Sequence, residues 1–288
     1  MITGQTNITI GNVSCSIQFE DNFFMDTFGL YLSDHEEWGF CTDGEPCMTI
    51  TVKEGHIPRS SSLSGHMFYH SLEYDTVSAS MLLDSAALQG EIGLTVVRRD
   101  DLTIVRITEL IELFVCTAFI FYFVLNGTGT FIHACGISDG NNGYIFTGPS
   151  GYGKSTIAKL SSPRTVLCDE MVLLKKDNCG RKSVFGTPFV GESAGLNRGV
   201  PCGGIYFIEQ SLSDELLPIS RMAGVISLMK EGMMGNFLSL KGIQDIFPSR
   251  DFLTLLLDLL EGIPCYRLRF RKDNSFWRLI DGNKNVTG

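Results

Sequence analysis

A nine-residue segment beginning at Gly148, GPSGYGKST, constrains the fold of this chain more than any other feature. It matches the phosphate-binding pattern G-x-x-x-x-G-K-[ST] at every fixed position. The apolar segment 144–147 precedes this phosphate loop, and an apolar helical face containing Ile157 and Leu160 follows it. A strand, a glycine-rich loop and a helix in this order predict an α/β fold with the loop at a strand end.

Each part of the phosphate loop has a chemical role in holding phosphate. The glycines let the backbone turn so that successive N–H groups point inward. Lys154 can reach the β- and γ-phosphates, and the Ser155 hydroxyl can bind Mg²⁺. The sequence therefore predicts a site for ATP and Mg²⁺. The residues expected to hold the nucleotide are Gly148, Ser150, Gly151, Tyr152, Gly153, Lys154, Ser155 and Thr156.

A pair of acidic residues follows the phosphate loop. Asp169 and Glu170 directly follow the apolar segment 166–168 and lie fifteen and sixteen residues after Lys154. Successive side chains of a strand diverge, so one carboxylate can hold a metal ion while the other faces an incoming hydroxyl. The alternative interpretation is a solvated strand end.

His133 and Arg198 are further candidates for the site, and each also has an explanation that involves no function. His133 lies in the otherwise apolar segment 130–135, where a single histidine is more often a satisfied core residue. Arg198 ends a segment rich in small residues, 187–198, and can supply the additional cation that phosphoryl transfer requires. An exposed arginine without such a role is the alternative.

The pattern of predicted strands and helices changes along the chain. Residues 1–102 are predicted to form a β-rich region of short strands and turns, and residues 103–288 a P-loop domain of alternating strands and helices. Segments 217–230 and 249–260 have helical periodicity. The predicted fold class is α/β (α+β), with a P-loop kinase core and a β-rich N-terminal region.

Charge and cysteine content limit the expected partners and compartment. The chain has 23 Lys and Arg against 32 Asp and Glu, for a net charge of −9. This balance argues against a general nucleic-acid or anionic-membrane binder, because both need a basic face. Nine scattered cysteines without a CxxC pair, together with an N-terminus unlike a signal peptide, predict a cytoplasmic protein.

One segment has the composition of a membrane span. Leu113–Leu125 is uncharged, but its 13 residues fall short of the roughly 20 that cross a bilayer. Charged residues, Glu109 and Glu112, come just before it. A buried helix is therefore the predicted structure, and no membrane partner is expected.

Taken together, four segments resemble the HPr kinase/phosphorylase C-terminal-like family. The resemblance covers roughly residues 105–270 and implies a P-loop domain with the phosphoenolpyruvate carboxykinase type of fold. The segments are FIHACG (131–136), YIFTGPSGYGKST (144–156), VLCDE (166–170), and GTPF with a later Asn-Arg (186–198).

The resemblance also implies roles for individual residues. Asp169 would act on the hydroxyl that receives phosphate, and Glu170 would lie by the metal ion. His133 and the pair Asn197-Arg198 match residues of the family's site. The residues themselves leave the oligomeric state open, whereas the resemblance implies a homo-oligomer.

The sequence departs from HPr kinases proper at several points. Thr156 stands where they carry Glu, Glu170 stands where they carry a second Asp, and their R-G-x-G-I-I stretch is missing after the acidic pair. HPr is therefore not the expected substrate. The chain looks more like the related proteins found beside peptide-modification systems, some of which are peptide serine kinases.

The leading prediction is an ATP- and Mg²⁺-dependent kinase that phosphorylates a hydroxyl of a peptide, a protein or a small hydroxy compound. Its predicted catalytic residues are Asp169, Lys154, His133 and Arg198, and its predicted metal ligands are Ser155 and Glu170. The alternative is a nucleotide-binding regulator or scaffold with little or no transferase activity. A GTPase is disfavoured, because Val286 replaces the acid of an N-K-x-D motif.

Overall fold

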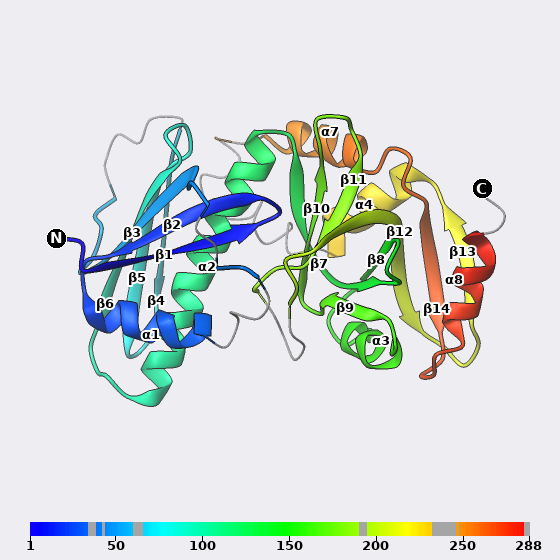
Figure 1. The fold of residues 1–288 in the computed structure, drawn as a ribbon, viewed down its shortest axis with the longest axis horizontal. Coiled ribbons are helices and arrows are strands. Elements are labelled where there is room, and N and C mark those ends of the chain that lie inside the picture. The colour runs from blue at the N-terminus through cyan, green and yellow to red at the C-terminus, as the bar shows by residue number, and fades with distance from the viewer. Residues whose placement is uncertain are drawn as a thin grey trace. The chain divides into compact units, whose positions relative to one another are not determined.

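The computed structural model describes residues 1–33, 39–41, 44–59, 66–189, 195–231, 246 and 248–284. The chain divides into two compact units. The first is formed mainly by residues 1–126, and the second by residues from Gly127 to Glu231 and from Arg250 onward. Figure 1 shows that both contain strands and helices, so the predicted mixed α/β class is confirmed.

The first unit contains a six-stranded sheet in the order β1-β2-β3-β6-β5-β4. β1 and β2 form an antiparallel hairpin that turns at Gly11 and Asn12, which have φ of 56° and 65°. The β-rich character expected before residue 102 is present. The elements are β1 (Gly4–Ile10), β2 (Val13–Phe19), α1 (Asn22–Ser33), β3 (Met48–Glu54), β4 (Met67–Glu73), β5 (Val77–Asp84), β6 (Gln89–Val96) and α2 (Asp101–Leu125).

Helix α1 was not expected from the sequence, which predicts only strands and turns in this region. Its buried residues include Phe24, Phe28 and Leu32, which recur every four residues. That spacing places them on one helical stripe, and the stripe packs toward β1, β2 and α2.

Helix α2 contains the uncharged segment 113–125 but begins earlier, after an N-cap at Asp100 whose carboxylate accepts the Thr103 N–H at 2.9 Å. Its 25 residues are long and apolar enough to cross a membrane by length and composition, but 72% of its most apolar window is buried inside the protein. It packs against α1, β5 and β6. Burial raises the pKa of Glu112 on this helix to about 7. The predicted buried helix is confirmed.

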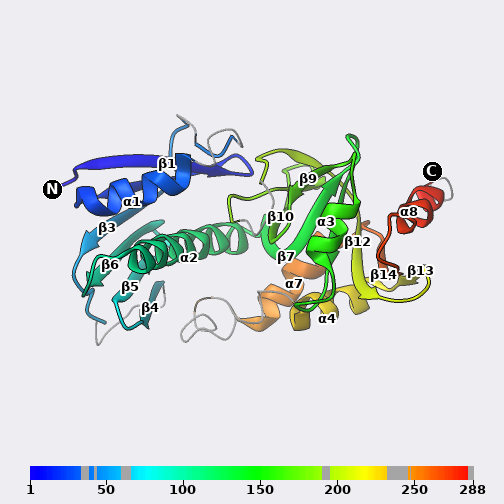
Figure 2. The same cartoon turned by 90° about the horizontal axis from the view of Figure 1, so that it is seen from below.

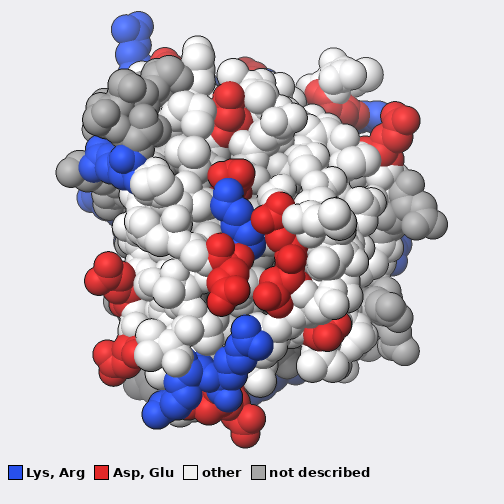
Figure 3. Space-filling model, turned by 90° about the vertical axis from the view of Figure 1, so that its left-hand side faces the viewer, with Lys and Arg blue, Asp and Glu red and all other residues white. Residues whose placement is uncertain are grey.

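Figure 2 shows α2 running alongside the strands of the first unit. Acidic and basic side chains are interspersed on the side of this unit seen in Figure 3. In the same unit, Lys53 of β3 and Glu91 of β6 form an ion pair of 2.9 Å.

The second unit contains a sheet in the order β11-β10-β7-β8-β12-β14-β13, with β9 also paired to β7. Because β11 pairs with both β10 and β12, the strands from β11 to β12 close into a small barrel. The elements are β7 (Gly129–Ser138), β8 (Gly143–Thr147), α3 (Lys154–Leu160), β9 (Thr165–Cys168), β10 (Met171–Lys176), β11 (Lys182–Phe185), β12 (Gly199–Gln210), β13 (Glu215–Ile219), α4 (Arg221–Glu231), α7 (Ser249–Leu259), β14 (Cys265–Phe270) and α8 (Phe276–Lys284).

Strands β8, β12 and β14 are parallel neighbours. Their side chains form a buried aromatic core with α3 and α8, in which Phe146, Tyr206 and Trp277 are almost fully covered. Parallel strands end at the same sheet edge, so the segments that follow β8 and β12 meet there.

The helix predicted over 217–230 begins later than expected. Residues 215–219 form β13 instead, antiparallel to β14, and α4 starts at Arg221. Pro218 fits this arrangement because β13 is the last strand in the sheet order, and an edge strand tolerates a residue without an N–H.

The predicted domain division at residue 102 stays a prediction. The compact units divide between Asn126 and Gly127, so the first unit includes α2 in addition to the β-rich region. β7 then opens the second unit, which carries the phosphate loop.

Candidate functional site

The phosphate loop lies where β8 ends and α3 begins. Gly151 and Gly153 have φ of 81° and 107°, a region of backbone conformation that favours glycine. A Cβ at Gly153 would lie 2.8 Å from Cζ of Phe270, and one at Gly148 would lie 3.2 Å from the Ile208 carbonyl oxygen. Backbone conformation and close packing therefore account for the glycines at 148, 151 and 153.

Lys154 lies beneath this loop with 7% of its surface exposed. Its Nζ donates to the carbonyl oxygens of Gly148 at 2.9 Å and Pro149 at 3.5 Å. Burial lowers the pKa of Lys154, and the negative charge of Glu170 opposes that shift. Because an ammonium group carries three N–H donors, one remains available to a ligand on the loop.

His133 of β7 and Glu170, just before β10, form a polar pair at the same site. His133 Nδ1 lies 3.4 Å from Oε1 of Glu170. The pairing of β7 with β10, which sets His133 opposite Met171, brings the two together. Burial and the charge of Lys154 lower the pKa of His133, whereas Glu170 acts in the opposite direction. The imidazole is therefore mainly neutral near pH 7.

Lys154, His133 and Glu170 line a cavity of about 260 Å³. The structure thus brings together most of the predicted phosphate loop, the predicted histidine and the second acid. The other lining residues are Ser150, Gly151, Gly153, Ser155, Thr156 and Gln210. Tyr152, also predicted to hold nucleotide, is 44% exposed and lies outside this wall.

Gln210 was missed by the sequence analysis. It ends β12, and its Nε2 donates to the Gly151 carbonyl oxygen at 3.5 Å. The signal that could have found it is the apolar segment 204–208, which is typical of a buried strand. Because the carboxyl ends of parallel strands meet at one edge, a polar residue just after that strand is a candidate neighbour of the loop.

Asp169 is not among the residues that line the cavity, and its predicted action on the acceptor hydroxyl stays a prediction. It is 2% exposed, whereas the Glu170 side chain is 44% exposed. Burial raises the pKa of the Cys135 thiol, and the nearby Cys168 and Asp169 add to that rise, so Asp169 lies on the thiol side. The two acids lie in the bend between β9 and β10 rather than in a strand, and Glu170 lines the cavity.

Arg198 is also outside the cavity wall. Its side chain is exposed, and it precedes the first residue of β12, whereas Gln210 at the last residue of that strand lines the cavity. In the described structure Arg198 therefore matches the alternative of an exposed arginine. Residues 190–194 of the same predicted loop lie outside the described residues.

The oxygen atoms available to a metal ion come from Ser155 and Glu170, which both line the cavity. In the part of the chain that the structure describes, His, Cys, Asp and Glu do not gather in threes around a metal position. Mg²⁺ commonly uses one or two protein oxygens together with water and phosphate oxygens. The residues present therefore fit Mg²⁺ bound with a nucleotide.

Comparison with protein families corrects the expected family. A family model described as SynChlorMet cassette protein ScmC matches residues 97–283. The chain belongs to the ScmC family. The predicted membership of the HPr-kinase-related family is wrong, because the match is to ScmC and no kinase family model matches. A search of curated proteins found no match.

The error has a physical reason. The segments that carried the resemblance surround the phosphate loop, where glycines, a lysine and nearby acids are selected by phosphate chemistry. Similar sites recur on chains of different families. The ScmC match includes α2 and the described second unit up to Asn283, so it covers the candidate site.

Proposed function

We propose that this ScmC-family chain is an ATP- and Mg²⁺-dependent kinase that transfers phosphate to a hydroxyl group in the cytoplasm. In this proposal the second unit is a P-loop kinase core. The acceptor is a Ser or Thr of a peptide or protein, or a small hydroxy compound. The supporting observation is that the phosphate-loop wall and the His133–Glu170 pair line one cavity.

The loop residues would hold the nucleotide phosphates through backbone N–H groups and the Lys154 ammonium. Ser155 and Glu170 would hold the metal ion through their side-chain oxygens. When bound, ATP and Mg²⁺ would supply the phosphoryl group and the cation that offsets its charge. Gln210, which donates to the Gly151 carbonyl oxygen, would hold the phosphate loop in its curved backbone conformation.

We assign the proton-accepting role to His133 rather than to Asp169, because only His133 lines the cavity. With its Nδ1–H directed at Glu170, the neutral imidazole leaves Nε2 to accept the proton of an acceptor hydroxyl. Glu170 would then stabilise the imidazolium that forms. Asp169 would support the strand end without touching the reacting groups.

A nucleotide-binding regulator or scaffold is the second candidate. Two observations favour it: Asp169 is buried and Arg198 lies away from the cavity. A site of this kind would bind nucleotide through the loop and Lys154 but supply little stabilisation to a transferring phosphoryl group.

Calorimetric titration with a non-hydrolysable ATP analogue and Mg²⁺ tests the nucleotide site. We expect saturable binding to the wild type, loss in Lys154→Ala, and retention in Lys159→Ala, which removes an exposed lysine from the same helix. Asp169→Asn should bind like the wild type. Absence of binding to the wild type would contradict both proposed functions.

ADP formation from ATP and Mg²⁺, with Ser/Thr peptide pools and small hydroxy compounds as acceptors, separates the two candidates. The kinase proposal expects acceptor-dependent ADP formation. It also expects His133→Gln to lower kcat by about 10²–10⁴ while the affinity for the ATP analogue stays unchanged. Binding without transfer to any acceptor would favour the regulator.

A further inference from the structure

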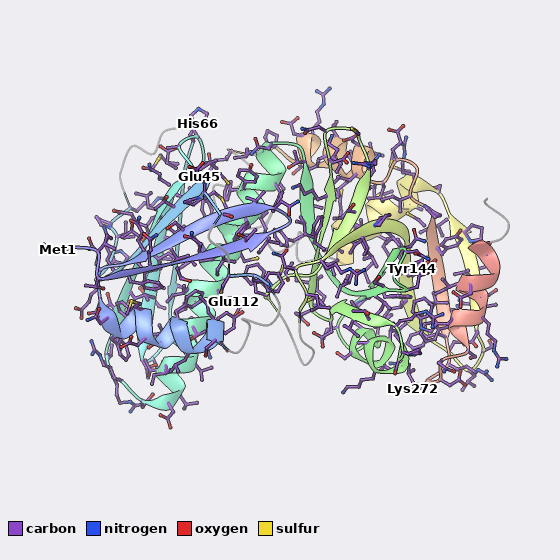
Figure 4. All side chains as sticks on the ribbon, viewed as in Figure 1. Met1, Glu45, His66, Glu112, Tyr144 and Lys272 are labelled. Carbon is purple, nitrogen blue, oxygen red and sulfur yellow. The ribbon has the colours of Figure 1, made fainter. Side chains whose placement is uncertain are left out.

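A second cavity, of about 220 Å³, lies in the same unit as the phosphate loop. Its wall includes Tyr144 near the start of β8 and Gly203 in the first half of β12, whereas the loop follows the last residue of β8. At about 3.3 Å per strand residue, Tyr144 and Gly148 are roughly 13 Å apart. Figure 4 labels Tyr144 on β8. The cavity is separate from the candidate nucleotide site, and we call it the tyrosine cavity.

Three tyrosines, Tyr144, Tyr206 and Tyr266, line the tyrosine cavity. The ring of Tyr206 stacks on Phe146 at 5.1 Å and on Tyr266 at 5.3 Å between centroids. Both faces of this ring are therefore covered, and its edge and hydroxyl remain for the cavity. The glycine at position 204 leaves the space beside the Tyr206 hydroxyl open, because a Cβ on residue 204 would lie 3.1 Å from the Tyr206 oxygen.

The hydroxyl of Tyr206 differs from those of its neighbours. Tyr144 donates to Oδ2 of Asp139 at 2.8 Å, and Nδ2 of Asn283 donates to the Tyr266 oxygen at 2.6 Å. Tyr206 is only 3% exposed, and its hydroxyl has no hydrogen-bond partner among the described residues. Because Tyr206 lines the cavity, this hydroxyl is free to donate to a group bound there.

The chemistry of the wall favours an uncharged ligand. Among the described residues, none of its lining side chains is Lys, Arg, Asp or Glu. Asp281, which lies near Tyr206, is held by Arg164 at 2.7 Å. Burial, followed by the neighbouring tyrosines, raises the pKa of Tyr206, so its hydroxyl stays a hydrogen-bond donor. The matching ligand group is a neutral acceptor such as a carbonyl oxygen.

Two further features narrow the ligand class. Two asparagines, Asn142 and Asn283, line the cavity together with the apolar residues Pro264 and Ile280. A side-chain amide pairs well with another amide, because each offers an N–H donor and a carbonyl acceptor. Pockets that combine apolar walls with a few converging polar groups are typical of small-molecule sites.

We propose that the tyrosine cavity is a binding site for a small neutral amide with an apolar body, whose carbonyl oxygen accepts a hydrogen bond from the Tyr206 hydroxyl. The amides of Asn142 and Asn283 bind the rest of its polar group, and Ile280 and Pro264 cover its apolar part. This site is independent of the proposed kinase activity.

Three probes of matched size test the proposal by NMR titration of the full chain: benzamide, benzoate and benzylamine. We expect saturable binding of neutral benzamide, with weaker binding of the anion and the cation. Tyr206→Phe keeps the stacked ring but removes the donor, and should weaken benzamide binding about tenfold. Asn283→Ala should also weaken it, whereas Tyr74→Phe, a substitution of an exposed tyrosine in the first unit, should leave it unchanged.

Several outcomes would overturn the proposal. They are no saturable binding of benzamide, equal binding of all three probes, or unchanged affinity in both Tyr206→Phe and Asn283→Ala. The first outcome would mean that the cavity holds water only, and the other two would mean that binding does not use the Tyr206 hydroxyl and the asparagine amides. Benzamide binding that persists in Lys154→Ala would support the proposal even if the nucleotide site fails its own test.

Discussion

The two ends of strands β8 and β12 carry cavities of opposite character. At the carboxyl ends, the phosphate loop supplies glycines with positive φ and a buried lysine, and the His133–Glu170 pair completes the cavity wall. At the other ends, tyrosine hydroxyls and asparagine amides form an uncharged wall. The comparison teaches that one sheet can provide two ligand chemistries, because charged side chains line one cavity and uncharged side chains line the other.

Lys154→Ala should produce the largest difference between the two cavities. Transfer should fall by about 10²–10³, the usual cost of losing a charge-stabilising donor, while benzamide binding at the tyrosine cavity stays unchanged. Acceptor-dependent ADP formation and the NMR titration measure the two effects, with Lys159→Ala as the control. A parallel loss at both cavities would indicate that the substitution damages the whole unit.

Gly153→Ala tests whether close packing requires glycine at this position of the phosphate loop. Forcing a side chain onto φ of 107° costs about 1–3 kcal/mol, and the new Cβ would meet Cζ of Phe270 at 2.8 Å. Gly151→Ala is the matched control, because its φ is 81° but its Cβ would meet no atom within 4 Å. Urea unfolding should show the larger loss of stability for Gly153→Ala, and equal losses would contradict the packing role.

Two Tyr→Phe substitutions test which hydroxyls of the tyrosine cavity are already hydrogen-bonded in the ligand-free protein. Tyr144→Phe removes a hydrogen bond to Asp139 and should cost about 1 kcal/mol of stability. Tyr206→Phe removes a hydroxyl without a partner among the described residues and should change stability by less than about 0.5 kcal/mol. Urea unfolding of the ligand-free protein compares them. A larger loss for Tyr206→Phe would mean that its hydroxyl is already satisfied.

The smallest expected effect is a pH dependence from His133. Its pKa is lowered from 6.5 in the folded protein, so below pH 6.5 the unfolded chain binds more protons there than the folded one. His133 therefore makes stability rise with pH up to about 6.5. Urea unfolding at several pH values gives the free energy of unfolding of the wild type and of His133→Asn. The difference between the two curves isolates the contribution of His133, and a slope of opposite sign would contradict the assigned surroundings of the imidazole.

The sequence by itself determined the local features. The phosphate loop follows from consecutive residues, since its turn needs glycine at 151 and 153 and its cation comes from Lys154. The buried helix α2 follows from a long apolar segment preceded by charged residues. The acidic pair was expected to diverge because strand side chains alternate.

Tertiary structure alone decided which side chains share a site. Pairing of β7 with β10 set His133 beside Glu170 and left Asp169 buried, and parallel pairing of β8 with β12 brought Gln210 to the loop. The tyrosine cavity joins residues from β8, β12, β14 and α8. Loop chemistry is encoded within nine consecutive residues, whereas strand register and helix packing depend on contacts between distant parts of the chain.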